Sequence, residues 1–181
     1  DTLVLYTSDH GSHFCTRNSE YKRSCHDGCI RVPMIASGPG FSGGKVVDEL
    51  VSLIDLPPTI LNIGGVETPA YMRGRPLQAL AEGDATDWPE EVFLQISESQ
   101  VGRAIRTKKW KYSVTAPDKD GVADSESDSY VEDFLYDLEN DPHERNNLVK
   151  SEPHVAIRER LSEILKNRMV QAGEQEPTIL Q

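Results

Sequence analysis

The chain opens with a short apolar run that leads directly into a polar turn. Residues 2–7 are apolar, aromatic or β-branched, and residues 8–11 read Ser-Asp-His-Gly. A continuous apolar run of this length is typical of a strand buried on both faces of a parallel sheet. Because such a strand needs neighbours to cover it, we expect residues 1–66 to be the edge portion of a larger α/β sheet.

Further α/β elements follow this first strand. Residues 31–36 form a second short apolar run, and residues 46–47 indicate a brief third strand. Asp55 is a favourable N-cap, prolines are tolerated in the first helical turn, and a Gly-Gly pair stands at the stop. These features predict a helix over residues 56–63.

The pattern then changes from α/β to mainly β. Residues 67–90 are expected to link or wrap the structure as loops, and residues 91–181 to form an α+β subdomain. Four strands are predicted there, over residues 92–97, 102–107, 109–115 and 134–138. A helix from about residue 151 to residue 172 is predicted by an apolar stripe of Ile157, Leu161, Ile164, Leu165 and Met169. The expected fold class is therefore α/β, with a small α+β subdomain in which the terminal helix packs on an antiparallel sheet.

Charge and hydropathy exclude two classes of partner. The net charge is -11, and no basic block offsets the acidic residues, so we expect no nucleic acid as a partner. No window approaches the roughly 18 consecutive apolar residues of a membrane helix, so we expect no membrane span.

The three cysteines, Cys15, Cys25 and Cys29, lie close together in loop-like sequence. They form no C-x-x-C pair, so their spacing does not indicate a structural zinc site. One disulfide with one free thiol, or three buried thiols, both agree with this pattern.

Asp9 and His10 are the first residues with metal-binding chemistry. They follow the first strand, at the edge where open α/β sheets place their ligands. A carboxylate offers a divalent cation a hard oxygen and an imidazole offers a nitrogen, and Gly11 permits the sharp turn that both would need to reach one ion. The alternative is that Asp9 caps the next segment and His10 packs in a turn.

The wider run resembles the sulfatase family of the alkaline-phosphatase superfamily. Members show a strand ending in S-D-[NH]-G, a lysine about a dozen residues later, and an R-V-P strand ending in P-G. The same spacing runs here from Asp9 through Lys22 to Pro33. Further matching pieces lie in order over residues 52–59, 103–107, 110–112, 135–138 and 141–148.

The resemblance implies a role for three of these residues. Asp9 and His10 match the second pair of metal ligands, usually for calcium (Ca2+), although His10 stands where many relatives have Asn. Lys22 matches the lysine that contacts the sulfate ester near its leaving oxygen. A cation there offsets the charge that develops on the sulfuryl oxygens and on the departing alkoxide.

Other charged residues crowd the same loop. Arg17 and Arg23 suit the binding of a polyanionic substrate such as a sulfated polysaccharide. His13 and His26 are candidates for substrate contact or proton transfer. Hydrogen bonding within the loop is the competing interpretation for the two histidines.

The chain lacks the motif that supplies the family's formylglycine nucleophile, C-x-[PA]-x-R or its Ser equivalent. The nearest approaches, at residues 37–41 and 151–155, both lack the Arg. The family's first pair of metal ligands is also missing. We therefore expect a C-terminal portion, without turnover by itself, whose partner is the missing N-terminal half of the same enzyme.

Three functions agree with these observations. The first is a sulfuric-ester hydrolase acting on a sulfated carbohydrate, exported as most members of the family are. The second is a phosphonate or phosphodiester hydrolase on the same alkaline-phosphatase-like sheet. The third is a non-catalytic module that binds anionic glycans.

Overall fold

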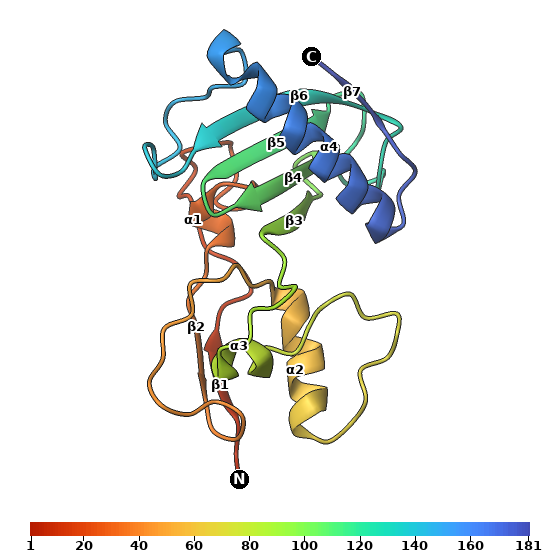
Figure 1. Ribbon diagram of the computed structural model, residues 1–181. Helices are drawn as coiled ribbons and strands as arrows, with labels where there is room; N and C mark the ends of the chain where they lie inside the picture. Colours follow the sequence, from red (N-terminus) through yellow and green to blue (C-terminus); the bar gives the residue numbers. More distant parts are fainter. The chain divides into compact units, whose positions relative to one another are not determined.

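The computed structural model describes residues 1–181 and divides the chain into two compact units. Residues 1–9 and 32–90 form the first unit, and residues 10–31 and 91–181 form the second (Figure 1). The loop at residues 10–31, which the sequence analysis grouped with residues 1–66, thus packs with the C-terminal sheet. The domain boundaries after residues 66 and 90 stay a prediction.

The first unit contains a two-stranded sheet. Strand β1 (Val4–Thr7) pairs antiparallel with β2 (Met34–Ser37), with Val4 opposite Ser37. The structure differs here from the predicted parallel strand buried on both faces. Side chains alternate along β1, so Val4 and Tyr6, which are 59% and 62% exposed, share one uncovered face.

Helices complete the first unit. The predicted helix is confirmed as α2 (Leu56–Ile63), preceded by the 3-10 turn η1 (Leu53–Asp55). Asp55 does not cap α2 through its side chain; its carboxylate instead accepts the backbone N–H of Ser52 and of Arg75, both at 2.8 Å. A further helix, α3 (Gln78–Glu82), lies in the segment predicted as loops, and residues 46–47 form no strand.

The second unit is built on a five-stranded sheet in the order β3-β4-β5-β6-β7. All neighbours are antiparallel except β6 and β7, which are parallel. The strands are β3 (Glu91–Ile96), β4 (Val101–Thr107), β5 (Trp110–Ala116), β6 (Ser129–Asp137) and β7 (Thr178–Leu180). The four predicted strands correspond to β3–β6, whereas β7 was not predicted.

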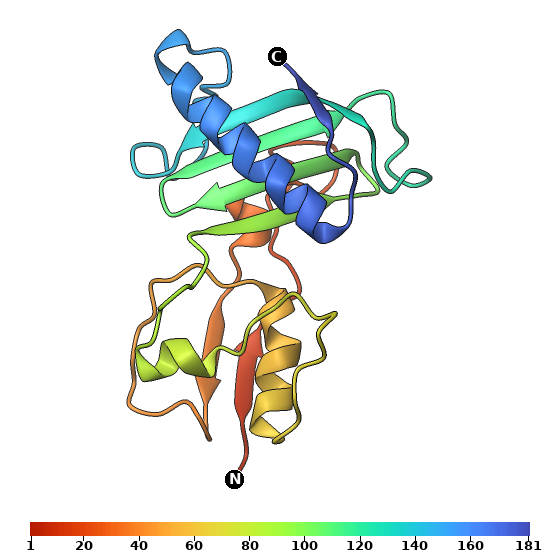
Figure 2. The same cartoon turned by 45° about the vertical axis from the view of Figure 1, so that its right-hand side comes forward.

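Two helices pack in the second unit. The terminal helix α4 (Val155–Ala172), preceded by η2 (Glu152–His154), lies across one face of the sheet (Figure 2). Its apolar stripe faces the core as predicted, since Leu161, Leu165 and Met169 are fully buried. The short helix α1 (Asp27–Ile30) belongs to the loop of residues 10–31.

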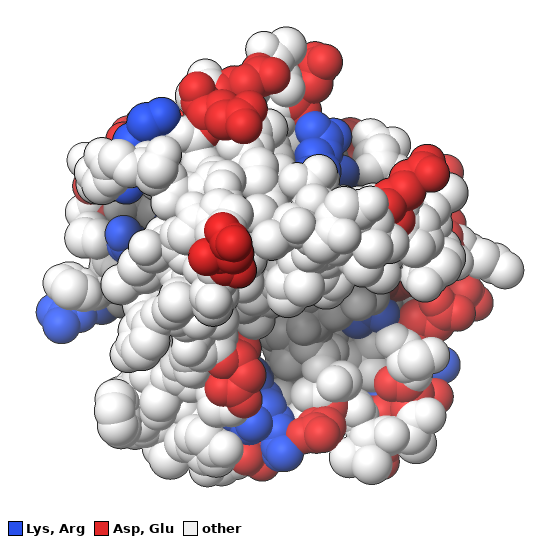
Figure 3. Space-filling view, turned by 90° about the horizontal axis from the view of Figure 1, so that it is seen from below, with Lys and Arg blue, Asp and Glu red and all other residues white.

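Acidic side chains dominate the charge of the chain. Figure 3 shows Asp and Glu scattered over one face, with Lys and Arg interspersed rather than gathered into one patch. No helix is both long enough and apolar enough to cross a membrane.

Candidate functional site

His10 and Lys22 lie next to each other in the second unit. The Lys22 Nζ is 2.9 Å from His10 Nε2, and His10 Nδ1 is 2.8 Å from the carbonyl oxygen of Gly11. A carbonyl oxygen can only accept, so Nδ1 carries the proton and Nε2 accepts from the Lys22 ammonium. With this assignment the lone pair of Nε2 is directed at the Lys22 ammonium.

Backbone contacts of the loop bring residues 10 and 22 together. The N–H of Gly11 donates to the carbonyl of Cys29 at 2.7 Å, which ties the start of the loop to α1. The carbonyl of Tyr21 accepts from the N–H of His13 at 2.9 Å and from Ser12 Oγ at 3.0 Å. The residue before Lys22 is thereby fixed beside the residues that follow His10.

The Tyr21 ring lies beside His10 and Lys22. It is half exposed, its centroid lies 6.0 Å from that of His10, and Lys22 Nζ lies 5.5 Å from its centroid. An ammonium at this distance from an aromatic face is attracted by the ring quadrupole. The sequence analysis did not select Tyr21, because a single tyrosine in a loop carries no signal of its partners.

Asp9 follows β1 and is exposed, with Ser8 Oγ donating to its Oδ1 at 3.4 Å. Its carboxylate suits a hard divalent cation, and the Nε2 lone pair of His10 suits one after the Lys22 ammonium is displaced. Calcium takes about 6–8 oxygen ligands. No group of three or more His, Cys, Asp or Glu side chains converges here, so the donors fit part of a coordination shell.

The two other candidate histidines are buried. His26 is 9% exposed, packs 4.8 Å from the Phe134 ring, and has its ring nitrogens 3.1 Å from Ser24 Oγ and 3.4 Å from the Tyr136 hydroxyl. Burial, followed by the charges of Arg17 and others, lowers the pKa of His26 to about 3. This placement favours a neutral packing residue, and its role in proton transfer stays a prediction.

His13 is 6% exposed, and its Nε2 lies 3.2 Å from the Lys22 carbonyl oxygen. Its Nδ1 is buried without a hydrogen-bond partner. His13 thus holds the backbone of Lys22 rather than its ammonium group. Its predicted catalytic role is likewise untested.

The two candidate arginines have partners within the protein. Arg17 donates to the carbonyls of Glu144 and His143, at 2.7 and 2.6 Å. Arg23 forms ion pairs with Glu20, at 3.1 Å, and with Glu98. Substrate binding by either guanidinium would compete with these contacts, so both roles stay predictions.

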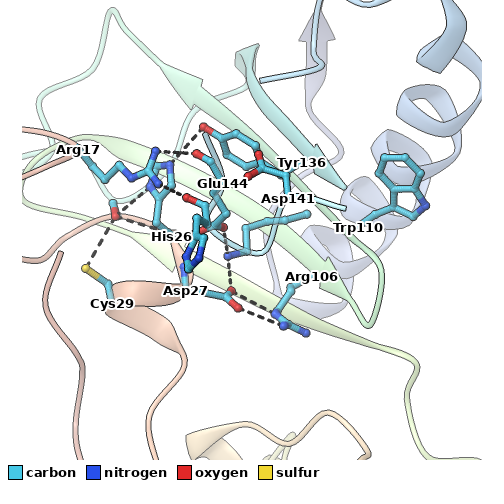
Figure 4. A network of polar contacts seen from close by, with 12 residues as sticks. Arg17, His26, Asp27, Cys29, Arg106, Trp110, Tyr136, Asp141 and Glu144 are labelled. Carbon is cyan, nitrogen blue, oxygen red and sulfur yellow. Dashed lines mark hydrogen bonds and ion pairs between the residues drawn. The ribbon is translucent and has the colours of Figure 1, made fainter. Parts of the chain in front are cut away.

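A buried charge cluster of Asp27, Arg106, Lys111 and Glu144 lies beneath the loop (Figure 4). The Lys111 ammonium is fully buried and pairs with the carboxylates of Asp27 and Glu144. Arg106 donates from Nη2 to Asp27 at 3.2 Å, and the backbone N–H of Asp27 donates to Glu144 at 2.8 Å. The sequence analysis did not predict this cluster.

The contacts of the cluster favour the ionised form of Asp27. Burial alone would raise the pKa of Asp27, but the hydrogen bonds and charges of Arg106 and Lys111 outweigh burial and lower this pKa. Two carboxylates and two cations also leave the cluster without net charge.

Residues 19–171 match the family described as N-sulphoglucosamine sulphohydrolase, C-terminal. The chain belongs to this family. Arylsulfatase K of Mus musculus is 30% identical to it over 164 residues, which cover 85% of this chain and 28% of that protein. The chain thus spans less than a third of the length of this curated relative.

Solved structures share the fold. A 2-O GAG sulfatase is 25% identical, with a TM-score of 0.77 over 94% of this chain and 36% of that one. A protein solved with its substrate D-glucosamine-2-N,6-O-disulfate gives a TM-score of 0.81 at 24% identity, over 97% of this chain and 35% of that one. The phosphonate monoester hydrolase of Silicibacter pomeroyi gives 0.74 at 24% identity, over 97% and 36%. These last two likenesses concern the fold alone.

Proposed function

We propose that the protein containing this chain hydrolyses sulfate esters of a carbohydrate, R–O–SO3⁻ + H2O giving R–OH and HSO4⁻. The observation that carries the proposal is the contact of Lys22 with His10, directly after the S-D-H-G strand end. Membership of a sulphohydrolase family supports the reaction class. The likeness to a structure described as a 2-O GAG sulfatase supports a sulfated glycan as the substrate.

Lys22 supplies positive charge where negative charge develops. As the S–O bond breaks, charge grows on the sulfuryl oxygens and on the leaving alkoxide, and a fixed ammonium nearby lowers the barrier. In the structure the His10 imidazole accepts a hydrogen bond from this ammonium at Nε2, and a cation bound at Nε2 would take the place of that hydrogen bond. Tyr21 keeps the ammonium on one side of the loop.

Asp9 and His10 would hold a divalent cation, for which we propose calcium. Such an ion would supply a fixed positive charge against the sulfate oxygens. The nucleophile is proposed to be a formylglycine in the part of the protein that lies outside these residues. We also propose that the protein is exported.

A second candidate activity is phosphonate or phosphodiester hydrolysis, because a phosphonate monoester hydrolase shares the fold. Sulfate monoesters carry one negative charge and phosphonate monoesters also carry one, so charge alone does not separate them. Family membership favours the sulfate ester.

The test is turnover by the full-length protein, coexpressed with a formylglycine-generating system. The rate of hydrolysis of an aryl sulfate, an aryl phosphonate and a sulfated oligosaccharide is measured for the wild type, Lys22→Ala and Lys150→Ala. Lys150 is an exposed lysine and serves as the matched control. We expect sulfate release that falls about 100-fold or more in Lys22→Ala and stays unchanged in the control. Preferred phosphonate turnover would instead support the second candidate.

A further inference from the structure

We infer that the buried charge cluster positions the His10–Lys22 pair by fixing helix α1 against the C-terminal sheet. The geometric part of this inference stands on contacts within the second unit. Its kinetic consequence rests on the proposed function. The residues of the cluster are thus positioning residues, since they act on the pair through α1 and the turn after β6.

The cluster joins three separate segments of the chain. Arg106 and Lys111 come from the neighbouring strands β4 and β5, Asp27 comes from α1, and Glu144 comes from the turn after β6. Glu144 accepts both the Lys111 ammonium and the Asp27 backbone N–H. The first turn of α1 is therefore held by directional contacts from a rigid sheet.

The contacts continue from α1 to the site. The carbonyl of Cys29, two residues after Asp27, accepts the Gly11 N–H at 2.7 Å. The Gly11 carbonyl in turn accepts from His10 Nδ1 and so selects the tautomer that faces Lys22. A shift of α1 would therefore move Gly11 and reorient the imidazole.

Arg17 adds a second link. It lies in the loop between His10 and Lys22 and donates to the carbonyls of residues 143 and 144. Figure 4 shows its guanidinium beside Glu144, with dashed lines to that segment. The turn that carries Glu144 thus holds the loop as well as α1.

Stability alone does not explain this arrangement. Desolvating a lysine and two carboxylates is costly, and apolar residues of similar volume often stabilise a core equally well or better. Ion pairs with good geometry, however, fix direction and register, which apolar contacts do not. A cluster that orients α1 accounts for charges in a place where stability does not require them.

The test compares the two carboxylates of the cluster with a paired carboxylate outside it, in the full-length protein. Glu144→Gln and Asp27→Asn each remove one charge of the cluster while keeping the shape of the side chain. Glu174→Gln is the matched control, because Glu174 also forms an ion pair with a buried cation, Arg103 of β4 at 2.7 Å, and this ion pair includes no residue of α1. Arg106→Gln, at the partly exposed rim of the cluster, is a milder variant for the case that the others do not fold.

The first readout, taken in EGTA so that no cation competes for Nε2, is the ¹⁵N chemical shifts of the His10 ring, which report the protonated nitrogen and the hydrogen bond to Lys22. We expect the shifts to change toward mixed tautomers in the cluster variants and to stay at the wild-type values in Glu174→Gln. Wild-type shifts in every folded cluster variant would overturn the inference. This readout needs no turnover, so it decides the inference even if the protein hydrolyses no sulfate ester.

The second readout is kinetic and applies once the wild type releases sulfate. Displacement of catalytic groups by a distant change costs up to about 100-fold in rate. Because the cluster variants would displace Lys22, we expect their kcat to fall by roughly tenfold or more, with KM changed far less. Equal losses of kcat in Glu174→Gln, at matched thermal stability, would assign the cluster a merely structural role.

Discussion

Gly11 lies where the loop after β1 approaches α1 most closely. The sequence analysis assigned this glycine to a sharp turn, yet its φ is not positive. Glycine is needed at this position for lack of space, because an added Cβ would overlap the carbonyl oxygen of Gly28. The structure therefore explains the same residue by packing against a neighbour 17 residues away in the sequence.

Gly11→Ala is expected to lower the free energy of unfolding by about 1–3 kcal/mol, since the backbone of α1 must move to admit the methyl group. Thermal and urea unfolding of the variant and the wild type measure the change. Gly64→Ala is the control, because the nearest atom to its added Cβ lies at 3.4 Å. Equal stability of Gly11→Ala and the wild type would contradict the steric argument.

Tyr21 tests the role of the aromatic ring at the same scale. Tyr21→Ala removes the face that attracts the Lys22 ammonium, a contact worth about 0.5–1 kcal/mol at an exposed site. We expect kcat/KM for an aryl sulfate to fall roughly two- to fivefold in Tyr21→Ala and to stay near the wild-type value in Tyr21→Phe. A loss of similar size in Tyr21→Phe would show that the hydroxyl, rather than the ring face, matters.

The cysteines form neither one disulfide with a free thiol nor three buried thiols, the two patterns that agreed with their spacing. All three are free thiols; Cys15 is exposed, whereas Cys25 and Cys29 are buried. Burial raises the pKa of Cys25 to about 12, so its reactive thiolate is scarcely populated. Iodoacetamide should label Cys15 alone in the folded protein and all three after denaturation, as peptide mass spectrometry can measure.

At the scale of elements, the residue at the N-cap of α1, His26, is acid-sensitive. The pKa of His26 is about 3 in the fold, below its ordinary value of 6.5. Between these two values the unfolded chain binds more protons than the folded one, so stability falls as the pH falls through this window. The lowered pKa of Asp27 adds a further loss only below the ordinary range of carboxyl groups.

His26→Gln removes the titrating group while keeping a polar side chain. We expect the variant to lose less stability than the wild type between about pH 6.5 and pH 3, where each unit of pKa difference is worth about 1.4 kcal/mol. Urea unfolding at a series of pH values measures this slope. Parallel curves for the two proteins would show that His26 titrates normally.

Elements with a long, repeated pattern were predictable from the sequence. The apolar stripe of α4, and the prolines in the first turn of α2 with the glycine at its end, each indicate a helix without any tertiary information. The short elements α1, α3 and β7 have only 4, 5 and 3 residues, so they show no complete period. Their formation depends on partners elsewhere in the chain, such as Glu144 for α1.

Some features of the candidate site could likewise be predicted from the sequence, and others could not. The spacing from Asp9 to Lys22 was sufficient to select Lys22 and His10, which the structure brings into contact. Spacing could not show that Arg17 donates to carbonyls 126 and 127 residues away. A cationic side chain in a loop therefore indicates a substrate contact only after its partners within the fold are known.

At the scale of the whole molecule, the metal ligands supplied by this chain determine what it can do by itself. Calcium takes about 6–8 oxygen ligands, whereas Asp9 and His10 offer one carboxylate and one imidazole. We therefore expect EGTA to abolish sulfate release by the full-length protein and added calcium to restore it. Asp9→Asn should need a higher calcium concentration for the same rate.

The 181-residue chain alone should respond differently, because no group of three or more ligand side chains converges in it. We expect its thermal unfolding midpoint to be the same in EGTA and in micromolar calcium, whereas the midpoint of the full-length protein should rise on calcium addition. Differential scanning calorimetry of both samples measures this. A calcium-dependent rise in the isolated chain that Asp9→Asn removes would place a complete site within these residues and would contradict a shared one.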